Sequence, residues 1–126
     1  MLIGLDAGTS ALKAVLFSRD GRVIASSRYS YPMLHPAPGY AEQYAADWWT
    51  ALVAAVRELI RDIDPLQVCA IGLSTQGGTL QAVNTESQAL HPAISWMDTR
   101  ASQQNAIFRE CIGSERMREI TGWSLC

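Results

Sequence analysis

The sequence predicts an α/β fold in which a small antiparallel β-sheet is followed by a helix and a further strand. Residues 2–17 consist of two apolar runs separated by a polar turn, which is typical of a β-hairpin. Residues 47–63 repeat apolar side chains at the i, i+3, i+4 spacing of one helix face. Residues 68–73 then form a continuous apolar run, as a buried strand does.

The hairpin is expected to contain strands over residues 2–6 and 11–17. A turn over residues 18–21 leads into a third strand at about residues 22–31. The segment 32–40 contains three prolines and a glycine, so it is expected to be a loop.

The helix over residues 47–63 has Asp47 at its start, where a carboxylate can cap the helix or favour its dipole. Pro65 is expected to end it. Its predicted buried face comprises Trp49, Leu52, Val53, Val56, Leu59, Ile60 and Ile63.

The apolar strand over residues 68–73 is expected to lie in the middle of the sheet, with Cys69 buried in it. A short strand is expected at 79–84 and a helix from about 98 to 112. A last helix is expected to begin after the cap Ser114 and to stop at Gly122.

Composition indicates a packed domain and excludes several classes of partner. Apolar residues make up 48% of the 126 residues and charged residues 17%, which predicts one modest core. The formal net charge of −2 gives no electrostatic footprint for nucleic acid, and no apolar run is long enough to span a membrane. Three widely spaced cysteines (Cys69, Cys111 and Cys126) and the lack of a signal peptide predict a cytoplasmic protein with reduced thiols.

The tip of the hairpin carries the residue types that bind phosphate. Gly8 can adopt a positive φ and leaves room for a ligand, while Thr9 and Ser10 offer hydroxyl and N–H donors. Asp6 is a candidate ligand for Mg²⁺, directly or through water, and Lys13 supplies a positive charge. An ordinary hairpin with a polar tip explains the same residues, and no Walker sequence occurs.

Four segments together resemble a known family. The turn at residues 6–9 resembles the first phosphate motif of the actin-like ATPase superfamily. Residues 39–49 are similar to the GW-EQ-P--WW stretch of FGGY-family carbohydrate kinases, residues 71–78 to their IGLSGQ strand and loop, and residues 92–100 to their PAI-W-D-R element. The segments occur in the family's order, so the chain is identified as resembling the N-terminal part of such a kinase.

The resemblance implies a ribonuclease-H-like fold and transfer of the ATP γ-phosphoryl group to a hydroxyl of a small sugar or polyol, with ATP and Mg²⁺ required. Residues 1–126 would then form the N-terminal portion of the first, sugar-binding domain. The family's general-base aspartate and its nucleotide domain are expected beyond residue 126, so the isolated chain is expected to be inactive. Because the strand over 68–73 reads as apolar on both faces, the chain is also expected to self-associate.

The resemblance places the sugar site at Gln76, Gly77, Gly78, Trp96, Asp98 and Arg100. Glycerol kinases carry Arg-Glu after the equivalent glutamine and xylulokinases carry Met-His, whereas this chain has two glycines. The open space favours a substrate bulkier than glycerol, although a tight turn also explains the pair.

Several alternatives remain open. Trp96 is interpreted either as a core residue or as a wall of the sugar site. Asp98 and Arg100 either bind substrate or pair with each other to hold a loop. The rival functions are another actin-like ATPase and a non-catalytic sugar-binding or regulatory remnant.

Overall fold

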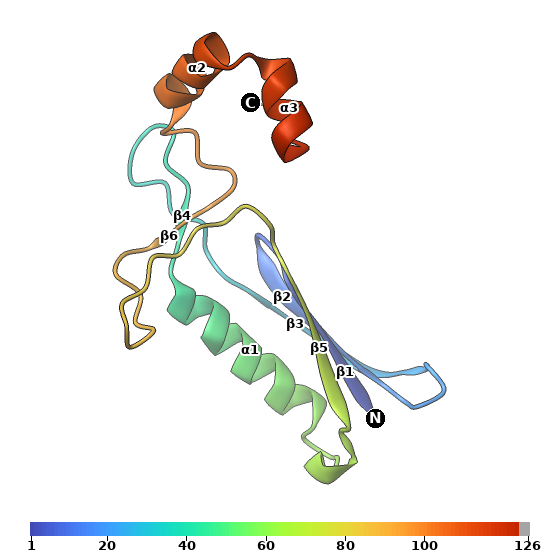
Figure 1. Ribbon diagram of the computed structural model, residues 1–126. Coiled ribbons are helices and arrows are strands. Elements are labelled where there is room, and N and C mark those ends of the chain that lie inside the picture. Colours follow the sequence, from blue (N-terminus) through green and yellow to red (C-terminus); the bar gives the residue numbers. More distant parts are fainter. Residues whose placement is uncertain (124–126) are drawn as a thin grey trace.

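The computed structural model describes residues 1–123. Figure 1 shows the elements, which follow one another as β1 (Leu2–Ala7), β2 (Ala11–Phe17), β3 (Val23–Ser30), β4 (Glu42–Gln43), α1 (Ala45–Leu59), a 3₁₀ turn (Pro65–Gln67), β5 (Ala70–Thr75), β6 (Ala93–Ile94), α2 (Ser102–Cys111) and α3 (Ser114–Thr121). The predicted hairpin, third strand and long helix are confirmed within a few residues.

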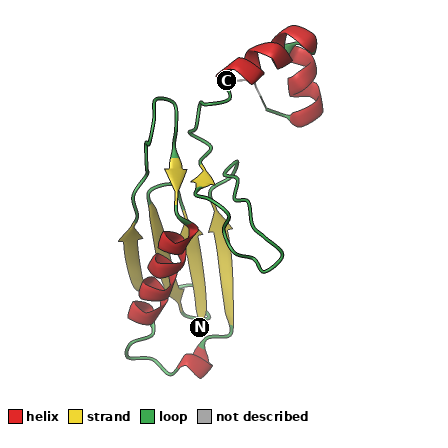
Figure 2. Cartoon of the chain, turned by 90° about the vertical axis from the view of Figure 1, so that its left-hand side faces the viewer, coloured by secondary structure: helices red, strands yellow, loops and turns green. Residues whose placement is uncertain are grey.

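Four strands form the main sheet in the order β3-β2-β1-β5. β1 pairs antiparallel with β2, and β2 pairs antiparallel with β3. β5 pairs parallel with β1, a connection that needs a crossover, and α1 supplies it. Figure 2 shows α1 lying across one face of this sheet. The α/β prediction is therefore confirmed.

The core lies between α1 and the strands of the hairpin. Alternate residues of β1 and β2 face the helix, because successive side chains of a strand point to opposite faces. Small residues on α1 allow the helix to approach the sheet closely. The buried cluster consists of Ile3, Leu5, Leu12, Ala14, Leu16, Tyr31, Ala51, Ala55 and Leu59.

The helix differs from its prediction at both ends and on one face. Its N-cap is Tyr44, which makes no side-chain cap bond, and Asp47 lies in the first turn, near the helix dipole. It ends at Leu59, before Pro65, which begins the 3₁₀ turn. The prediction that Trp49 is buried is wrong, because its exposed fraction is 66% and alanines occupy the line that faces the sheet.

The apolar run at residues 68–73 is not the middle of the sheet. β5 begins at Ala70 and is the edge strand, with Ile71 and Leu73 more than half exposed. α1 packs over β2 and β3 instead, so among residues 1–123 no helix covers this edge. Cys69 is exposed just before the strand, which contradicts its predicted burial.

The second half of the chain contains little regular sheet. The predicted strand at 79–84 is replaced by isolated pairs, Leu80 with Ile94 and Val83 with Ala89. β4 and β6, which were not predicted, pair with each other. The helix predicted from residue 98 begins at Ser102.

α2 and α3 lie beyond one end of the sheet (Figure 1). α3 has Gly113 as its N-cap, at a φ of 84°, rather than Ser114. It ends at Gly122 in the left-handed conformation, as predicted. No helix in residues 1–123 is long and apolar enough to cross a membrane. The predicted thiol Cys126 lies outside the described residues.

Candidate functional site

The polar turn between β1 and β2 is held by its own backbone and by Tyr31. The Gly8 N–H donates to the Ala11 carbonyl at 3.1 Å, and the Tyr31 hydroxyl donates to the Gly8 carbonyl. Gly8 does not adopt a positive φ, which corrects that expectation. Its small size still matters, because a Cβ there would lie 3.4 Å from the Ala11 carbonyl oxygen. The Gly8 N–H is thus used within the turn, whereas the side chain of the exposed Ser10 faces solvent.

Asp6 and Lys13 stand opposite each other where the hairpin approaches this turn. They are register partners on β1 and β2, and the Lys13 Nζ lies 3.5 Å from the Asp6 Oδ2. Both side chains are about half exposed, so each charge keeps most of its hydration and its capacity for a further ligand. The pKa of the Tyr31 hydroxyl is raised, chiefly by burial and also by the negative charge of Asp6.

Gln76 follows β5 and is linked to the turn between β1 and β2 by a second glutamine. Its Nε2 donates to the Gln43 Oε1 at 3.0 Å. The Gln43 Nε2 donates in turn to the Thr9 carbonyl at 2.8 Å and to the Pro32 carbonyl at 3.2 Å. Gln43 is fully buried, and buried amides are retained where their hydrogen bonds are met. The sequence analysis did not place Gln43 in the site, although it lies in the segment that resembles GW-EQ-P.

Trp96 makes the direct link between the two predicted parts of the site. Its indole Nε1 donates to the Thr9 Oγ1 at 3.0 Å, and its backbone N–H donates to the Thr79 Oγ1 at 3.3 Å. The ring is more than half exposed, so it is not a core residue. Gly78 has a φ of +71°, and a Cβ on it would lie 3.2 Å from the Trp96 Cβ. Gly77 faces open space.

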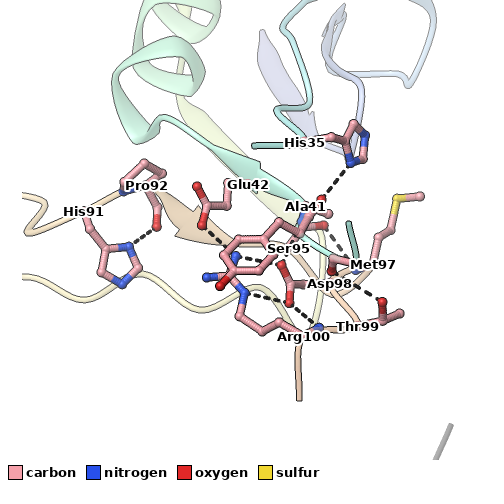
Figure 3. Close-up of polar contacts among 12 residues, drawn as sticks. His35, Ala41, Glu42, His91, Pro92, Ser95, Met97, Asp98, Thr99 and Arg100 are labelled. Carbon is pink, nitrogen blue, oxygen red and sulfur yellow. Dashed lines mark hydrogen bonds and ion pairs between the residues drawn. The ribbon is translucent and has the colours of Figure 1, made fainter. Parts of the chain in front are cut away.

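Asp98 and Arg100 belong to a different group of contacts, shown in Figure 3. The Arg100 Nη2 lies 2.7 Å from the Asp98 Oδ2 and 2.6 Å from the Glu42 Oε1, and its Nε donates to the Asp98 Oδ1. The Ala41 N–H also donates to Asp98, and the Arg100 guanidinium lies over the Tyr40 ring at 3.8 Å. We call Glu42, Asp98 and Arg100 the ion cluster.

The electrostatics of the ion cluster follow from these contacts. The Arg100 guanidinium, chiefly through its hydrogen bond, and then the N–H of Ala41 hold the pKa of Asp98 at about 2. The pKa of Arg100 is raised by its hydrogen bonds to Asp98 and Glu42. The cluster joins the loop around residues 39–42 to the loop around residues 95–100. Both oxygens of Asp98 and the Glu42 Oε1 are already hydrogen-bonded in it. This geometry favours the loop-holding interpretation of Asp98 and Arg100.

The structure therefore brings Thr9, Gln76 and Trp96 into one hydrogen-bonded network, beside Gly78. Asp6 and Lys13 lie at the same end of the hairpin, on β1 and β2. Within residues 1–123 no group of three or more His, Cys, Asp or Glu could hold a metal ion.

Comparison with known proteins identifies the class of protein to which this geometry belongs. Residues 1–126 match the model of the N-terminal domain of the FGGY family of carbohydrate kinases, and the chain belongs to that family. It is 32% identical over 124 residues to a glycerol kinase of Methylobacterium radiotolerans, covering 96% of this chain and 25% of the relative. It is 31% identical over 120 residues to a xylulose kinase of Staphylococcus xylosus, covering 95% and 25%.

Solved structures agree. A gluconate kinase from Lactobacillus acidophilus superposes with a TM-score of 0.87 at 26% identity, covering 94% of this chain and 24% of that one. A xylulose kinase from the same organism gives a TM-score of 0.86 at 26% identity, with the same coverage of 94% and 24%. The predicted ribonuclease-H-like fold is thereby confirmed. The chain spans about a quarter of the length of the curated relatives it matches.

Proposed function

We propose that this chain forms the phosphate- and sugar-binding part of an ATP-dependent kinase that transfers the γ-phosphoryl group to a hydroxyl of a sugar or polyol. The observation that carries this proposal is the hydrogen bond from the Trp96 indole to the Thr9 hydroxyl. This bond joins the turn proposed for phosphate to the loop proposed for sugar, which supports their use as one site. Phosphoryl transfer depends mainly on such positioning and on charge neutralisation.

At the phosphate turn, Thr9 and Ser10 are proposed to donate to phosphate oxygens and Lys13 to supply positive charge. Asp6 is proposed to hold Mg²⁺, directly or through water. Mg²⁺ in kinases is usually bound by one or two carboxylates together with substrate phosphates and waters, so a single half-exposed acid fits it. The bound ion would supply neutralisation of the charge on the phosphates.

At the sugar side, Gln76, Gly77, Gly78 and Trp96 are proposed to line the substrate site. Gly77 leaves open space in which a side chain would otherwise stand, and the exposed indole of Trp96 offers an apolar face to carbon-bound hydrogens. A substrate bulkier than glycerol is favoured. Asp98 and Arg100 are proposed to act as positioning residues that hold the Trp96 loop.

The general base is proposed to lie outside residues 1–126, in a further part of the sugar domain. Asp98 and Glu42 are both engaged by Arg100, and the lowered pKa of Asp98 makes it a weak base. The exposed side chains of Ile71 and Leu73 support the proposal that the isolated chain self-associates.

A coupled assay of phosphoryl transfer in the complete native protein tests the proposal. Asp6→Ala is expected to lower kcat by about 10²–10³, the usual effect of removing one group that stabilises developing charge. The KM for the sugar should stay nearly constant, because Asp6 serves the phosphates.

Asp20→Ala is the matched control. Asp20 pairs with Arg22 at 2.9 Å and is also an exposed acid of the hairpin sheet, but it lies in the turn between β2 and β3. Its replacement should leave kcat unchanged. Normal turnover in Asp6→Ala, or an equal loss in both variants, would show that Asp6 is only a structural residue of the hairpin.

A further inference from the structure

A small, partly open cavity lies between the start of α1 and the end of β5. Its volume is about 220 Å³, equivalent to about seven water molecules. Drug-sized ligands occupy larger pockets, so this one suits a small molecule or part of one. The lining residues are all uncharged: Ala7, Tyr31, Trp48, Thr75, Gln76, Thr79 and Gln81.

Three residues of this lining carry buried polar atoms without a partner. Within residues 1–123, the unpartnered buried side-chain atoms are the Trp48 Nε1, the Gln76 Oε1 and the Gln81 Oε1. Burial keeps bulk solvent from satisfying them, and a buried polar group without a partner destabilises the fold. That all three fall on one cavity indicates a common partner.

The amide nitrogens of the two glutamines are hydrogen-bonded within the protein. The Gln76 Nε2 donates to Gln43, and the Gln81 Nε2 donates to the carbonyls of Ala82 and His91. The unpartnered buried atoms are therefore one donor, the Trp48 indole N–H, and two amide oxygens that accept.

We propose that this cavity binds the non-reacting hydroxyls of a neutral sugar or polyol. A hydroxyl both donates and accepts, so adjacent hydroxyls can satisfy the indole N–H and the two amide oxygens together. A carboxylate or phosphate would meet two acceptor oxygens and no cation, and an ammonium group would leave the indole unsatisfied. The aromatic rings of Tyr31 and Trp48 suit the carbon-bound hydrogens of a sugar.

The cavity adjoins the proposed site of transfer, and the inference rests on the proposed function for this point. Gln76 belongs to both, and the Thr79 hydroxyl accepts the backbone N–H of Trp96. A substrate with one end beside Trp96 can therefore extend its other hydroxyls toward Trp48. Trp48 and Gln81 become specificity-determining residues that favour a chain longer than the three carbons of glycerol.

Nuclear magnetic resonance of the complete protein, ¹⁵N-labelled at tryptophan, tests this inference with xylitol, glycerol and gluconate as probes. Trp48 and Trp49 are neighbours on α1, but only Trp48 lines the cavity, whereas Trp49 is exposed. Xylitol is expected to shift the Trp48 indole N–H signal saturably and to leave the Trp49 signal in place. Glycerol should bind at least threefold more weakly than xylitol, and gluconate more weakly still.

Two matched variants extend the test. Trp48→Phe keeps an aromatic ring but removes the donor, so xylitol affinity should fall about threefold to tenfold. Trp49→Phe should bind xylitol as the unsubstituted chain does.

A Trp48 signal that xylitol does not move, an equal loss in both variants, or gluconate binding as tightly as xylitol would overturn the inference. The spectrum of the unsubstituted chain decides it even where Trp48→Phe does not fold. Failure here would leave the Asp6 kinase assay unaffected, and failure of that assay would not abolish xylitol binding.

Discussion

Two acid–base pairs in this chain use the same chemistry in opposite surroundings. Asp6 and Lys13 lie 3.5 Å apart with exposed side-chain fractions of 49% and 60%. Asp98 and Arg100 lie 2.7 Å apart with fractions of 3% and 25%, and both make further hydrogen bonds. The exposed pair can still form hydrogen bonds with a ligand, whereas the buried pair uses its hydrogen-bonding groups within the protein.

This difference separates ligand binding from loop positioning. A buried charge must have partners, since an unpaired one is costly, so the ion cluster is fixed in place. An exposed pair contributes little to stability and remains free to change partners. Asp6 and Lys13 therefore suit a ligand that comes and goes, such as a metal-bound phosphate.

The largest expected effect comes from breaking the ion cluster. Asp98→Ala should lower the free energy of unfolding by about 3 kcal/mol, because Arg100 is left with a half-paired, largely buried charge. Asp6→Ala should lower it by less than about 1 kcal/mol. Urea denaturation of both variants measures the contrast, and equal losses would erase the distinction between the pairs.

The same cluster predicts that the free energy of unfolding falls at acidic pH. The pKa of Asp98 is lowered from 3.8 to about 2, so its contribution is full above pH 3.8 and is lost as the pH falls through 2. In Asp98→Asn, the midpoint of unfolding should depend less on pH between about pH 4 and pH 2. If the unfolding midpoint of that variant depends on pH as in the unsubstituted protein, other carboxyl groups cause the loss of stability in acid.

An intermediate effect is expected at the glycine pair beside Trp96. Gly78→Ala should cost about 1–2 kcal/mol of stability, since an L-residue is strained at a φ of +71° and its Cβ would crowd Trp96. Gly77→Ala is the control, because its Cβ meets open space. Thermal unfolding compares them. A large residue at position 78 thus tests the fold, and one at position 77 is the better probe of the proposed sugar site.

The smallest expected effect concerns the contact between the two halves of the site. Trp96→Phe removes the hydrogen bond to the Thr9 hydroxyl, worth about 1 kcal/mol, so the KM for sugar in the complete protein should rise roughly fivefold. Thr9→Val removes the other partner, and the double variant should add little to either single change. Fully additive losses would show that the bond is not used.

The sequence predicted the hairpin well because its signals are local: two apolar runs and the polar turn between them. The helix face was harder, since Trp49 and the alanines both keep helical spacing and only the sheet decides which line is buried. The position of β5 in the sheet was predicted wrongly. An apolar run indicates that a strand favours burial, but it does not show whether another element of this chain covers it.

The candidate site shows the same division. Asp6, Thr9 and Trp96 could be nominated from motifs, but the role of Gln43 depends on three segments meeting, which one sequence does not reveal. The pairing of Glu42 with Arg100 is equally non-local. Only the short separation between Asp98 and Arg100 made their pairing an available hypothesis.

The most direct test of the central claim is paramagnetic broadening by Mn²⁺ and ATP in the ¹⁵N-labelled chain, with Mn²⁺ replacing Mg²⁺. Even weak binding should broaden the amide signals of Gly8, Thr9 and Ser10 and spare those of Thr99 and Arg100, with the effect lost in Asp6→Asn. Broadening centred on the ion cluster, or broadening of the turn that survives Asp6→Asn, would contradict the assignment of the exposed pair to phosphate.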